Sequence, residues 1–221
     1  MASTLLSTRL LTVAQQELVL NSGHGLVHYA CLEIIDHEVS MIDISASHII
    51  ITSSNAITAL KKIPRDLIQQ VYCVGEKTAA RVEDMGLKPA IVSSNSTQLA
   101  HAISQHHPTQ EFLFLCGKDR REELPAILKK NNVLFKEIIV YESVMVPKSF
   151  DRKFAAVLMF SPRGVYAFAK ANNAQPDNVI CIGETTAQAA REIYKVVHVA
   201  TKHTVENVIV TAIKVLNNDK K

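Results

Sequence analysis

The segments "VYCVGEKTAA" (residues 71–80) and "VICIGETTAQ" (residues 179–188) are two versions of one pattern. Six of their ten positions are identical, and Gly75 and Gly183 lie 108 residues apart. In each segment a short apolar run ends at glycine and glutamate, and an amphipathic stretch follows. Because the hydrophobic period changes at that point from continuous to helical, each segment predicts a buried strand that turns directly into a helix.

The repeat extends beyond these two segments. Ser53 and Ser161 are also 108 residues apart, and each closes an apolar run. Thr97 and Thr204, which are 107 residues apart, stand near the start of the next amphipathic stretch in their copies. A repeat of this length contains several strands and helices, so it predicts two similar domains rather than a short-period solenoid.

Short apolar runs alternate with amphipathic stretches along most of the chain. Runs that are apolar without alternation are typical of parallel strands covered by helices on both faces. We therefore expect an α/β fold with two parallel, flavodoxin-like sheets. The helix after residue 117 is expected to kink or to start late, because it contains Pro125. The expected strands lie at residues 47–54, 70–75, 88–94, 111–117, 154–161, 178–183 and 195–201, and a helix follows each.

The two ends of the chain are expected to form one domain. The C-terminal copy has no first strand of its own before residue 154, whereas "STLLSTRLL" (residues 3–11) predicts a strand near the N-terminus. Pairing that strand with the C-terminal half makes the other domain an insertion, connected by two extended segments that form a two-stranded linker. The predicted division is domain 1 at residues 1–30 and 147–221, domain 2 at residues 36–141, and linkers at residues 31–35 and 142–146.

Composition excludes several classes of protein. The 221 residues carry a formal charge of +3 without a clustered basic stripe, so we expect no nucleic-acid binding. No apolar run reaches the roughly 18 residues of a membrane span, and the N-terminus lacks the basic region of a signal peptide, so we expect a cytoplasmic protein that does not bind membranes. Four well-separated cysteines predict reduced core cysteines. Among nine histidines, His24 and His28 form one pair with helical spacing but have no third ligand nearby, so we expect no metal site.

The turns after the predicted strands are rich in glycine, serine and threonine. In an open α/β sheet such turns meet at the carboxyl edge, where ligands bind. The helix N-termini that follow present unpaired N–H groups and a partial positive charge, which favour a carboxylate or phosphate. The same residues are good N-caps, and for any single turn capping is the more frequent role. No G-x-G-x-x-G, G-x-x-x-x-G-K-[ST] or G-x-S-x-G motif occurs, which argues against a nucleotide cradle and an acyl-transfer nucleophile.

With these turns in order, the chain resembles the uroporphyrinogen-III synthase family. The resemblance covers nearly the whole length, and the order and spacing of the motifs carry it more than any single motif. The motifs are "IIITSSNAI" (49–57), "VGEKTA" (74–79), "FLCGKDRREELPAIL" (114–128), "IIVYESV" (138–144), "MFSPRGV" (159–165), "IGETTA" (182–187) and "KHTVENVIVTAI" (202–213).

The resemblance implies two α/β domains joined by a two-stranded ladder, and an enzyme without a cofactor. Members of the family take hydroxymethylbilane, a linear tetrapyrrole polycarboxylate, and close it with loss of water and inversion of the last pyrrole ring. The product, uroporphyrinogen III, is a precursor of haem and other tetrapyrroles. The resemblance further implies a monomer that makes a transient contact with the preceding deaminase.

The resemblance also implies roles for single residues. Loss of the substrate hydroxyl gives an electron-poor intermediate that closes to the symmetric type I isomer without the enzyme, so the protein must mainly hold one geometry. Tyr141 is expected to help the hydroxyl leave, and packing near the domain junction is an equally weighted alternative. The expected substrate-binding residues are Arg9, Thr52, Ser53, Ser54, Gly75, Lys77, Thr78, Gly117, Lys118, Ser161, Pro162, Arg163, Gly183, Thr185 and Thr186.

Two other functions stay open on the residues alone. A sugar-phosphate isomerase would also use serine- and threonine-rich turns, with Glu76 or Glu184 as its base. Glutamate in the first turn of a helix, however, stabilises the helix without any catalytic role. A non-catalytic two-domain protein would bind a small polyanion with the same turns.

Overall fold

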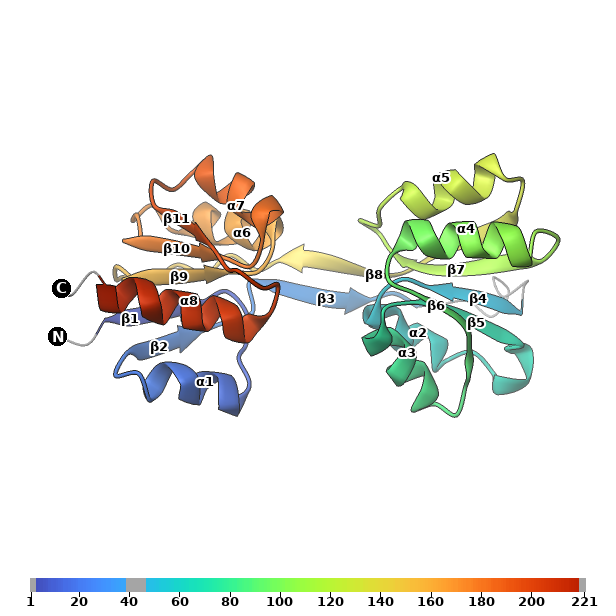
Figure 1. The fold of residues 1–221 in the computed structure, drawn as a ribbon, viewed down its shortest axis with the longest axis horizontal. Coiled ribbons are helices and arrows are strands. Elements are labelled where there is room, and N and C mark those ends of the chain that lie inside the picture. Colours follow the sequence, from blue (N-terminus) through green and yellow to red (C-terminus); the bar gives the residue numbers. More distant parts are fainter. Residues whose placement is uncertain (1–2, 39–46, 219–221) are drawn as a thin grey trace. The chain divides into compact units, whose positions relative to one another are not determined.

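The structure is a computed structural model that describes residues 3–38 and 47–218. The chain divides into two compact units, shown in Figure 1. Unit 1 consists of Met1–Glu33 and Val144–Lys221, and unit 2 consists of Ile34–Ser143. Both boundaries lie within the segments 31–35 and 142–146 that the sequence predicts as linkers. That the two units act as separate domains in function stays a prediction.

Unit 1 is a five-stranded sheet with helices on both faces (Figure 1). Its strand order is β2-β1-β9-β10-β11, and all neighbouring strands are parallel. Numbered along the unit, this is the flavodoxin-like order 2-1-3-4-5. The elements are β1 (Thr4–Ser7), α1 (Val13–Leu20), β2 (Gly25–His28), β9 (Ala156–Met159), α6 (Pro162–Ala171), β10 (Asn178–Cys181), α7 (Glu184–Arg191), β11 (Val197–Val199) and α8 (Val205–Asn218).

The N-terminal strand β1 lies in the interior of this sheet. It pairs with β2 on one side and with β9, about 150 residues later in the chain, on the other. Leu5 and Leu6 are fully buried, and because side chains alternate across a strand they belong to separate cores on the two faces. The prediction that the N-terminal strand joins the C-terminal half is therefore confirmed.

Unit 2 is a second parallel sheet, with strand order β6-β5-β4-β7-β8 and the linker strand β3 beside β8. Helices α2 and α3 lie on one face and α4 and α5 on the other (Figure 1). The elements are β3 (Leu32–Asp36), β4 (His48–Ile51), η2 (Ser54–Ala56), α2 (Ile57–Leu60), η3 (Arg65–Leu67), β5 (Gln70–Val74), α3 (Glu76–Glu83), β6 (Pro89–Ser93), α4 (Ser96–His106), β7 (Glu111–Gly117), α5 (Glu123–Lys130) and β8 (Leu134–Met145).

The two sheets have the same spatial arrangement but a permuted chain order. Strands β4, β5 and β6 of unit 2 take the places that β9, β10 and β11 take in unit 1. The remaining two strands follow this group in unit 2, as β7 and β8, but precede it in unit 1, as β1 and β2. The sequence repeat therefore matches three strands in each unit, and it stops where the permutation begins.

The linker strands β3 and β8 form an antiparallel ladder. The His37 N–H donates to the Val140 carbonyl at 2.9 Å, and the Val146 N–H donates to the Cys31 carbonyl at 2.9 Å. Numbers rise on one strand as they fall on the other, which defines the antiparallel direction. Strand β8 spans Leu134–Met145, and its first half pairs in parallel with β7. The strand is therefore longer than the predicted linker at residues 142–146.

His48, at the start of β4, is expected to make the stability of unit 2 depend on pH. Its Nδ1 lies 3.0 Å from the Tyr72 hydroxyl, and burial, followed by the charge of His107, lowers the His48 pKa below its ordinary value. The folded state then binds fewer protons than the unfolded state, so stability is lost as pH falls through the unfolded pKa near 6.5.

We expect the free energy of unfolding to fall between pH 7.5 and pH 5.5, and we expect His48→Gln to reduce that fall. Glutamine keeps an acceptor for the Tyr72 hydroxyl without titrating in this range. Urea unfolding followed by circular dichroism at the two pH values measures the difference. An identical pH dependence in His48→Gln would show that other groups cause it.

Candidate functional site

The candidate site of unit 2 is a cavity at the carboxyl edge of its sheet. Strands β4 and β7 are neighbours, and the chain proceeds from them in opposite directions, which makes this point a switch point where α/β proteins bind ligands. We call this the unit 2 cavity; its volume is about 420 Å³. It is lined by Thr52, Ser53, Val74, Ser94, Asn95, Ser96, Thr97, Phe114, Gly117, Asp119, Arg120, Arg121, Glu123, Leu124 and Tyr141.

Two capped helical turns supply hydrogen-bond donors to the unit 2 cavity. The Ser53 hydroxyl accepts from the Asn55 N–H at 3.3 Å, which leaves its own proton available to a ligand. The Asn95 side chain caps α4 by accepting from the Gln98 N–H at 2.9 Å. The N–H groups of Ser96 and Thr97 have no acceptor within the helix, because they belong to its first turn. This edge of the cavity therefore suits an anion.

Gly117 and Tyr141 form one wall of the cavity. They are paired between β7 and β8. A Cβ atom at Gly117 would lie 2.6 Å from Cζ and 2.8 Å from the hydroxyl oxygen of Tyr141. The tyrosine ring therefore covers the backbone of Gly117, and a residue with a side chain at position 117 would displace it.

Lys118 points to a carboxylate of β8 instead of lining the cavity. Its Nζ lies 2.9 Å from Glu142 Oε2, and this contact raises the pKa of Lys118 and lowers that of Glu142. The cations that do line the cavity are Arg120 and Arg121. Arg120 pairs with two glutamates, whereas Arg121 is exposed and forms no ion pair with any residue in the described ranges.

Unit 1 has a corresponding pocket at its own switch point, between β1 and β9. We call it the unit 1 pocket; its volume is about 390 Å³. The Ser161 hydroxyl caps α6 by accepting from the Gly164 N–H at 3.1 Å, as Ser53 does in the other copy. The pocket is lined by Thr8, Arg9, Leu10, Ala30, Cys31, Leu32, Phe160 and Ser161.

Arg9 lines this pocket, and Gly164 lies next to two of its lining residues, Cys31 and Ser161. The Arg9 guanidinium lies 5.4 Å from the centroid of the Phe160 ring, within the range of a cation–π contact. A Cβ atom at Gly164 would lie 3.1 Å from the Cys31 Sγ, so the first turn of α6 packs closely against the start of the linker. The pocket thus combines a cation, an aromatic ring and a helix N-terminus.

The glycine turn that the sequence repeats, at Gly75 and at Gly183, has a different conformation in each unit. Gly75 has φ of +80°, a conformation that favours glycine, whereas Gly183 is extended at −169°. At Gly183 the close neighbour is the His203 ring, whose Cε1 would lie 2.6 Å from a Cβ. Thr78 and Thr186, which follow these glycines, are 5% and 4% exposed. The two glycines are therefore needed for different reasons: Gly75 for its backbone conformation, and Gly183 for the space that the His203 ring occupies.

The structure brings together part of the predicted substrate-binding set. Thr52, Ser53, Gly117 and Tyr141 line the unit 2 cavity, and Arg9 and Ser161 line the unit 1 pocket. Pro162 and Arg163 follow Ser161 in the first turn of α6. Ser54 lines a separate groove with Lys61 and Arg81. Like Ser54, Pro162 and Arg163, the remaining predicted residues line neither site; they are Gly75, Lys77, Thr78, Lys118, Gly183, Thr185 and Thr186.

Sequence reasoning missed two parts of the unit 2 cavity. Asn95 and its neighbours were expected only as the start of a helix, although "SSNST" (93–97) is a dense run of capping residues after a strand. The sequence predicts Lys118 as the cation of this turn, whereas Arg121, three positions later in "GKDRR", lines the cavity. Nothing in the spacing distinguishes which of these cations faces the cavity, because the turn after β7 is irregular. That any of these residues binds substrate stays a prediction.

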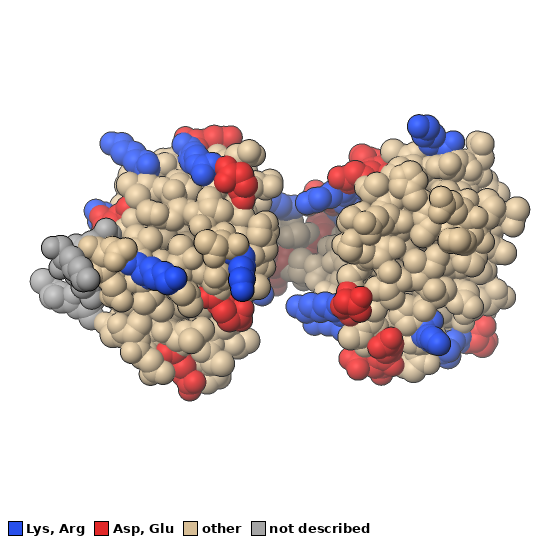
Figure 2. Space-filling view, viewed as in Figure 1, with Lys and Arg blue, Asp and Glu red and all other residues tan. Residues whose placement is uncertain are grey.

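The described residues, 3–38 and 47–218, contain no group of three histidine, cysteine or acidic side chains placed to hold a metal ion. None of the helices in these ranges is long and apolar enough to cross a membrane. The four cysteines are buried and unpaired, and burial raises the pKa of the Cys73 and Cys181 thiols to about 12. On the face shown in Figure 2, basic and acidic side chains are interspersed over both units.

Comparisons with known proteins identify relatives of the chain. A sequence model of the family described as uroporphyrinogen-III synthase HemD matches residues 15–210. Uroporphyrinogen-III synthetase from Helicobacter pylori is 18% identical, with a TM-score of 0.73 over 97% of this chain and 100% of its own. A mutant uroporphyrinogen III synthase from the extremely thermophilic bacterium Thermus thermophilus is 13% identical, with a TM-score of 0.64 over 98% of this chain and 100% of its own. No curated protein matches the sequence. At these identities the two structures show a shared fold.

Proposed function

The chain belongs to the uroporphyrinogen-III synthase family, and we propose that the unit 2 cavity and the unit 1 pocket bind carboxylates of its substrate. The enzyme is a cyclising lyase of haem biosynthesis, which closes hydroxymethylbilane with loss of water and inversion of the last pyrrole ring. The observation that carries this assignment is the family match over residues 15–210. The isomerase and non-catalytic alternatives are not favoured.

In the unit 2 cavity, three kinds of donor support carboxylate binding. They are the Ser53 hydroxyl, the N–H groups in the first turn of α4, and the guanidinium of Arg121. Hydrogen bonds from a charged group to a carboxylate are the strongest of these, and helix N–H groups add donors that no side-chain substitution removes. An acetate or propionate arm of the substrate fits this chemistry.

In the unit 1 pocket, Arg9 and Ser161 supply the corresponding donors. Ser161 resembles Ser53 in capping a helix while keeping its own hydroxyl proton for a ligand. Leu10 and Phe160 add an apolar surface against which a pyrrole ring can pack. This pocket is therefore proposed to take one substrate arm together with the pyrrole ring that carries it.

We propose that the Tyr141 hydroxyl donates a hydrogen bond to the substrate hydroxyl that leaves as water. Its ring lies in the cavity wall, beside the donors described above. Pyrrole nitrogens supply the electrons for this step, so a weak acid in the right position is sufficient. The structural alternative is that the ring only packs over Gly117.

We expect Tyr141→Phe to lower kcat about 10-fold, the equivalent of one hydrogen bond, while type III remains the main product. The backbone donors and the ring itself are retained, so the substrate is still held in its geometry. Initial rates of uroporphyrinogen III formation from hydroxymethylbilane give kcat and KM. Tyr166→Phe, which removes an exposed phenol that hydrogen-bonds Glu192, is the matched control and should leave kcat unchanged. Complete loss of activity in Tyr141→Phe, or no change at all, would contradict this role.

Three further proposals are supported by the resemblance to the family. They are a monomeric state, a cytoplasmic location, and a transient contact with the deaminase that supplies hydroxymethylbilane. Size-exclusion chromatography with light scattering tests the first: a mass near 24.4 kDa is expected, and a mass of twice that value would overturn it.

A further inference from the structure

We propose that Arg120 is a positioning residue, whose guanidinium clamps the turn between β7 and α5 to β8 and thereby holds Gly117 and Tyr141 in the geometry that directs closure to the type III isomer. This inference rests on the proposed function. It concerns unit 2 alone. Arg120 is neither one of the donors proposed to bind a substrate carboxylate nor the proposed hydrogen-bond donor to the leaving hydroxyl.

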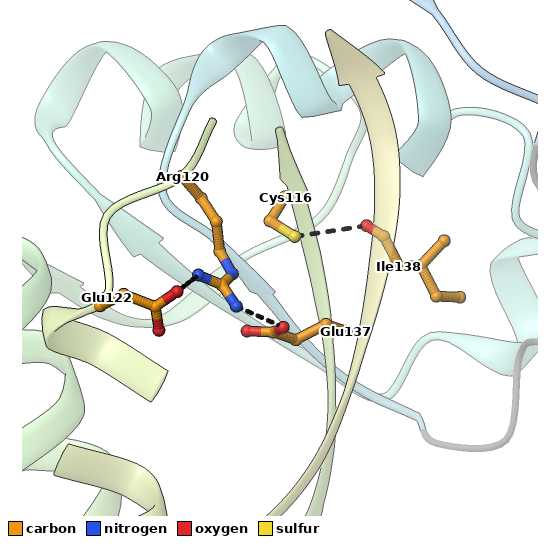
Figure 3. Close-up of polar contacts among 5 residues, drawn as sticks. All are labelled: Cys116, Arg120, Glu122, Glu137 and Ile138. Atoms are coloured by element: carbon orange, nitrogen blue, oxygen red, sulfur yellow. Dashed lines mark hydrogen bonds and ion pairs between the residues drawn. The ribbon is translucent and has the colours of Figure 1, made fainter. Parts of the chain in front are cut away.

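Arg120 joins two elements with one planar group. Its Nη1 donates to Glu122 Oε1 at 2.5 Å, and its Nη2 donates to Glu137 Oε2 at 2.6 Å (Figure 3). Glu122 stands immediately before α5, and Glu137 lies on β8. Because guanidinium presents its donors in a fixed fork, the two carboxylates are held at a defined separation and angle.

The turn is joined to β8 by the Arg120–Glu137 ion pair, by the Lys118–Glu142 ion pair, and by a backbone hydrogen bond from the Lys118 N–H to the Tyr141 carbonyl. Of these two ion pairs, Arg120–Glu137 is the better shielded. The Arg120 side chain is 18% exposed and that of Glu137 is 26% exposed. The Lys118–Glu142 pair, which joins the same two segments, involves a lysine side chain that is 59% exposed. Exposed pairs are screened by solvent and salt, so the Arg120 contact restrains the turn more strongly.

The negative charge of the Glu137 carboxylate is balanced by the Arg120 guanidinium. Its other carboxylate oxygen, Oε1, is buried and has no hydrogen-bond partner among the described residues. The neighbouring Cys116 thiol donates to the Ile138 carbonyl, with 3.6 Å between Sγ and oxygen, and so it does not serve Glu137 (Figure 3). Loss of Arg120 alone would leave a shielded carboxylate unpaired, which is strongly destabilising, whereas apolar replacement of both partners is often tolerated.

The clamp acts on the wall of the unit 2 cavity. Glu137 and Tyr141 lie four residues apart on β8, and Gly117, whose backbone the Tyr141 ring covers, begins the clamped turn. The Arg120 N–H also donates to the Gly117 carbonyl at 3.1 Å. Release of the guanidinium would let this turn shift relative to β8. A shift of about 1 Å in a positioning element costs as much as 100-fold in rate.

The central test is the double variant Arg120→Met/Glu137→Met, studied beside Glu137→Met and Arg120→Lys. The double variant removes the clamp without leaving an unpaired charge, so we expect it to keep the thermal unfolding temperature of the unmodified protein. We expect its kcat to fall about 10-fold or more with KM changed much less, and its type III share to fall at equal rates of hydroxymethylbilane consumption. Glu137→Met should lower kcat in the same way, because Arg120 then loses its hold on β8.

The other variants separate positioning from direct binding. Arg120→Lys keeps one charged contact but cannot bridge both carboxylates, so its kcat should lie between those of the unmodified protein and the double variant. Lys153→Met, which breaks the exposed Lys153–Asp177 pair in unit 1, is the control and should change neither rate nor isomer ratio.

Two results would overturn the inference. Unchanged kcat and type III share in the double variant would make the pair purely structural. A raised KM with normal kcat in the double variant, together with full activity in Glu137→Met, would make Arg120 a direct ligand of the substrate. Failure of the proposed function is a separate result, since the unmodified protein itself would then form no type III product.

Discussion

Replacement of Gly117 by alanine is expected to lower kcat for type III formation by about 100-fold. The added Cβ would lie 2.6 Å from the Tyr141 ring, closer than real Cβ contacts allow, so the ring or the β7 backbone must move. Both form the wall of the unit 2 cavity. The cost in stability should be smaller, about 1–3 kcal/mol, as for other overpacked sites. Steady-state kinetics and thermal unfolding of the same preparation separate the two effects.

Gly23→Ala is the matched control for loss of stability. Gly23 has φ of +79°, and a Cβ there would meet nothing within 4 Å, so alanine adds backbone strain of about 1 kcal/mol without touching either site. This variant should keep its kcat. If Gly117→Ala also retained full kcat, the contact between Gly117 and Tyr141 would have no part in the reaction.

Replacement of Leu6 by aspartate is expected to unfold unit 1 and to leave unit 2 folded. Leu6 is fully buried in the core formed by β1, β9 and α6, and an unpaired carboxylate there costs more than about 4 kcal/mol, a large part of the stability of a domain. The core clusters of unit 2 contain no residue of unit 1 among the described residues. Limited proteolysis should therefore leave a resistant fragment near residues 34–143.

Val13→Asp is the control for this substitution. Val13 is 71% exposed at the first position of α1, where a negative charge favours the helix dipole. Its proteolysis pattern should match that of the unmodified protein. Simultaneous loss of both units in Leu6→Asp would show that they do not fold independently, and an intact unit 1 would contradict the interior position of β1.

Much of the fold is predictable because buried parallel strands leave a strong signal. The runs at β4, β5, β7 and β10 are continuous and apolar, and those at β4, β5 and β10 are followed within two residues by a serine or glycine that begins a helical turn. The insertion of unit 2 also follows from the sequence, since the C-terminal half lacks a strand that the N-terminus supplies. Strand β2 was not predicted as a separate element, because it runs without a break in apolar character into the linker.

The permutation between the sheets could not be predicted from the repeat. The three repeated strands keep their order in both units, whereas the other two come after them in unit 2 and before them in unit 1, so the repeat itself does not place those strands. The candidate site was predicted only in part, because some of its residues are determined by local sequence and others by the path of the chain. Caps such as Ser53 and Ser161 follow from local sequence, whereas the direction of Arg121 and the ion pairs of Arg120 depend on the path of an irregular turn.

The glycine motif that occurs in both units shows that identical residues do not guarantee the same backbone conformation. Gly75 is required for its positive φ, whereas Gly183 leaves room for the His203 ring. Both turns begin a helix after a parallel strand, as expected. Neither turn lines the unit 2 cavity or the unit 1 pocket, although the repeat made them the first candidates.

The most direct test of the account is the identity of the cyclic product. Hydroxymethylbilane generated in situ would be incubated with the protein, and the oxidised porphyrins would be separated by isomer. The account predicts mostly type III porphyrin, formed faster than ring closure without protein. Type I porphyrin alone, formed at the rate seen without protein, would contradict it.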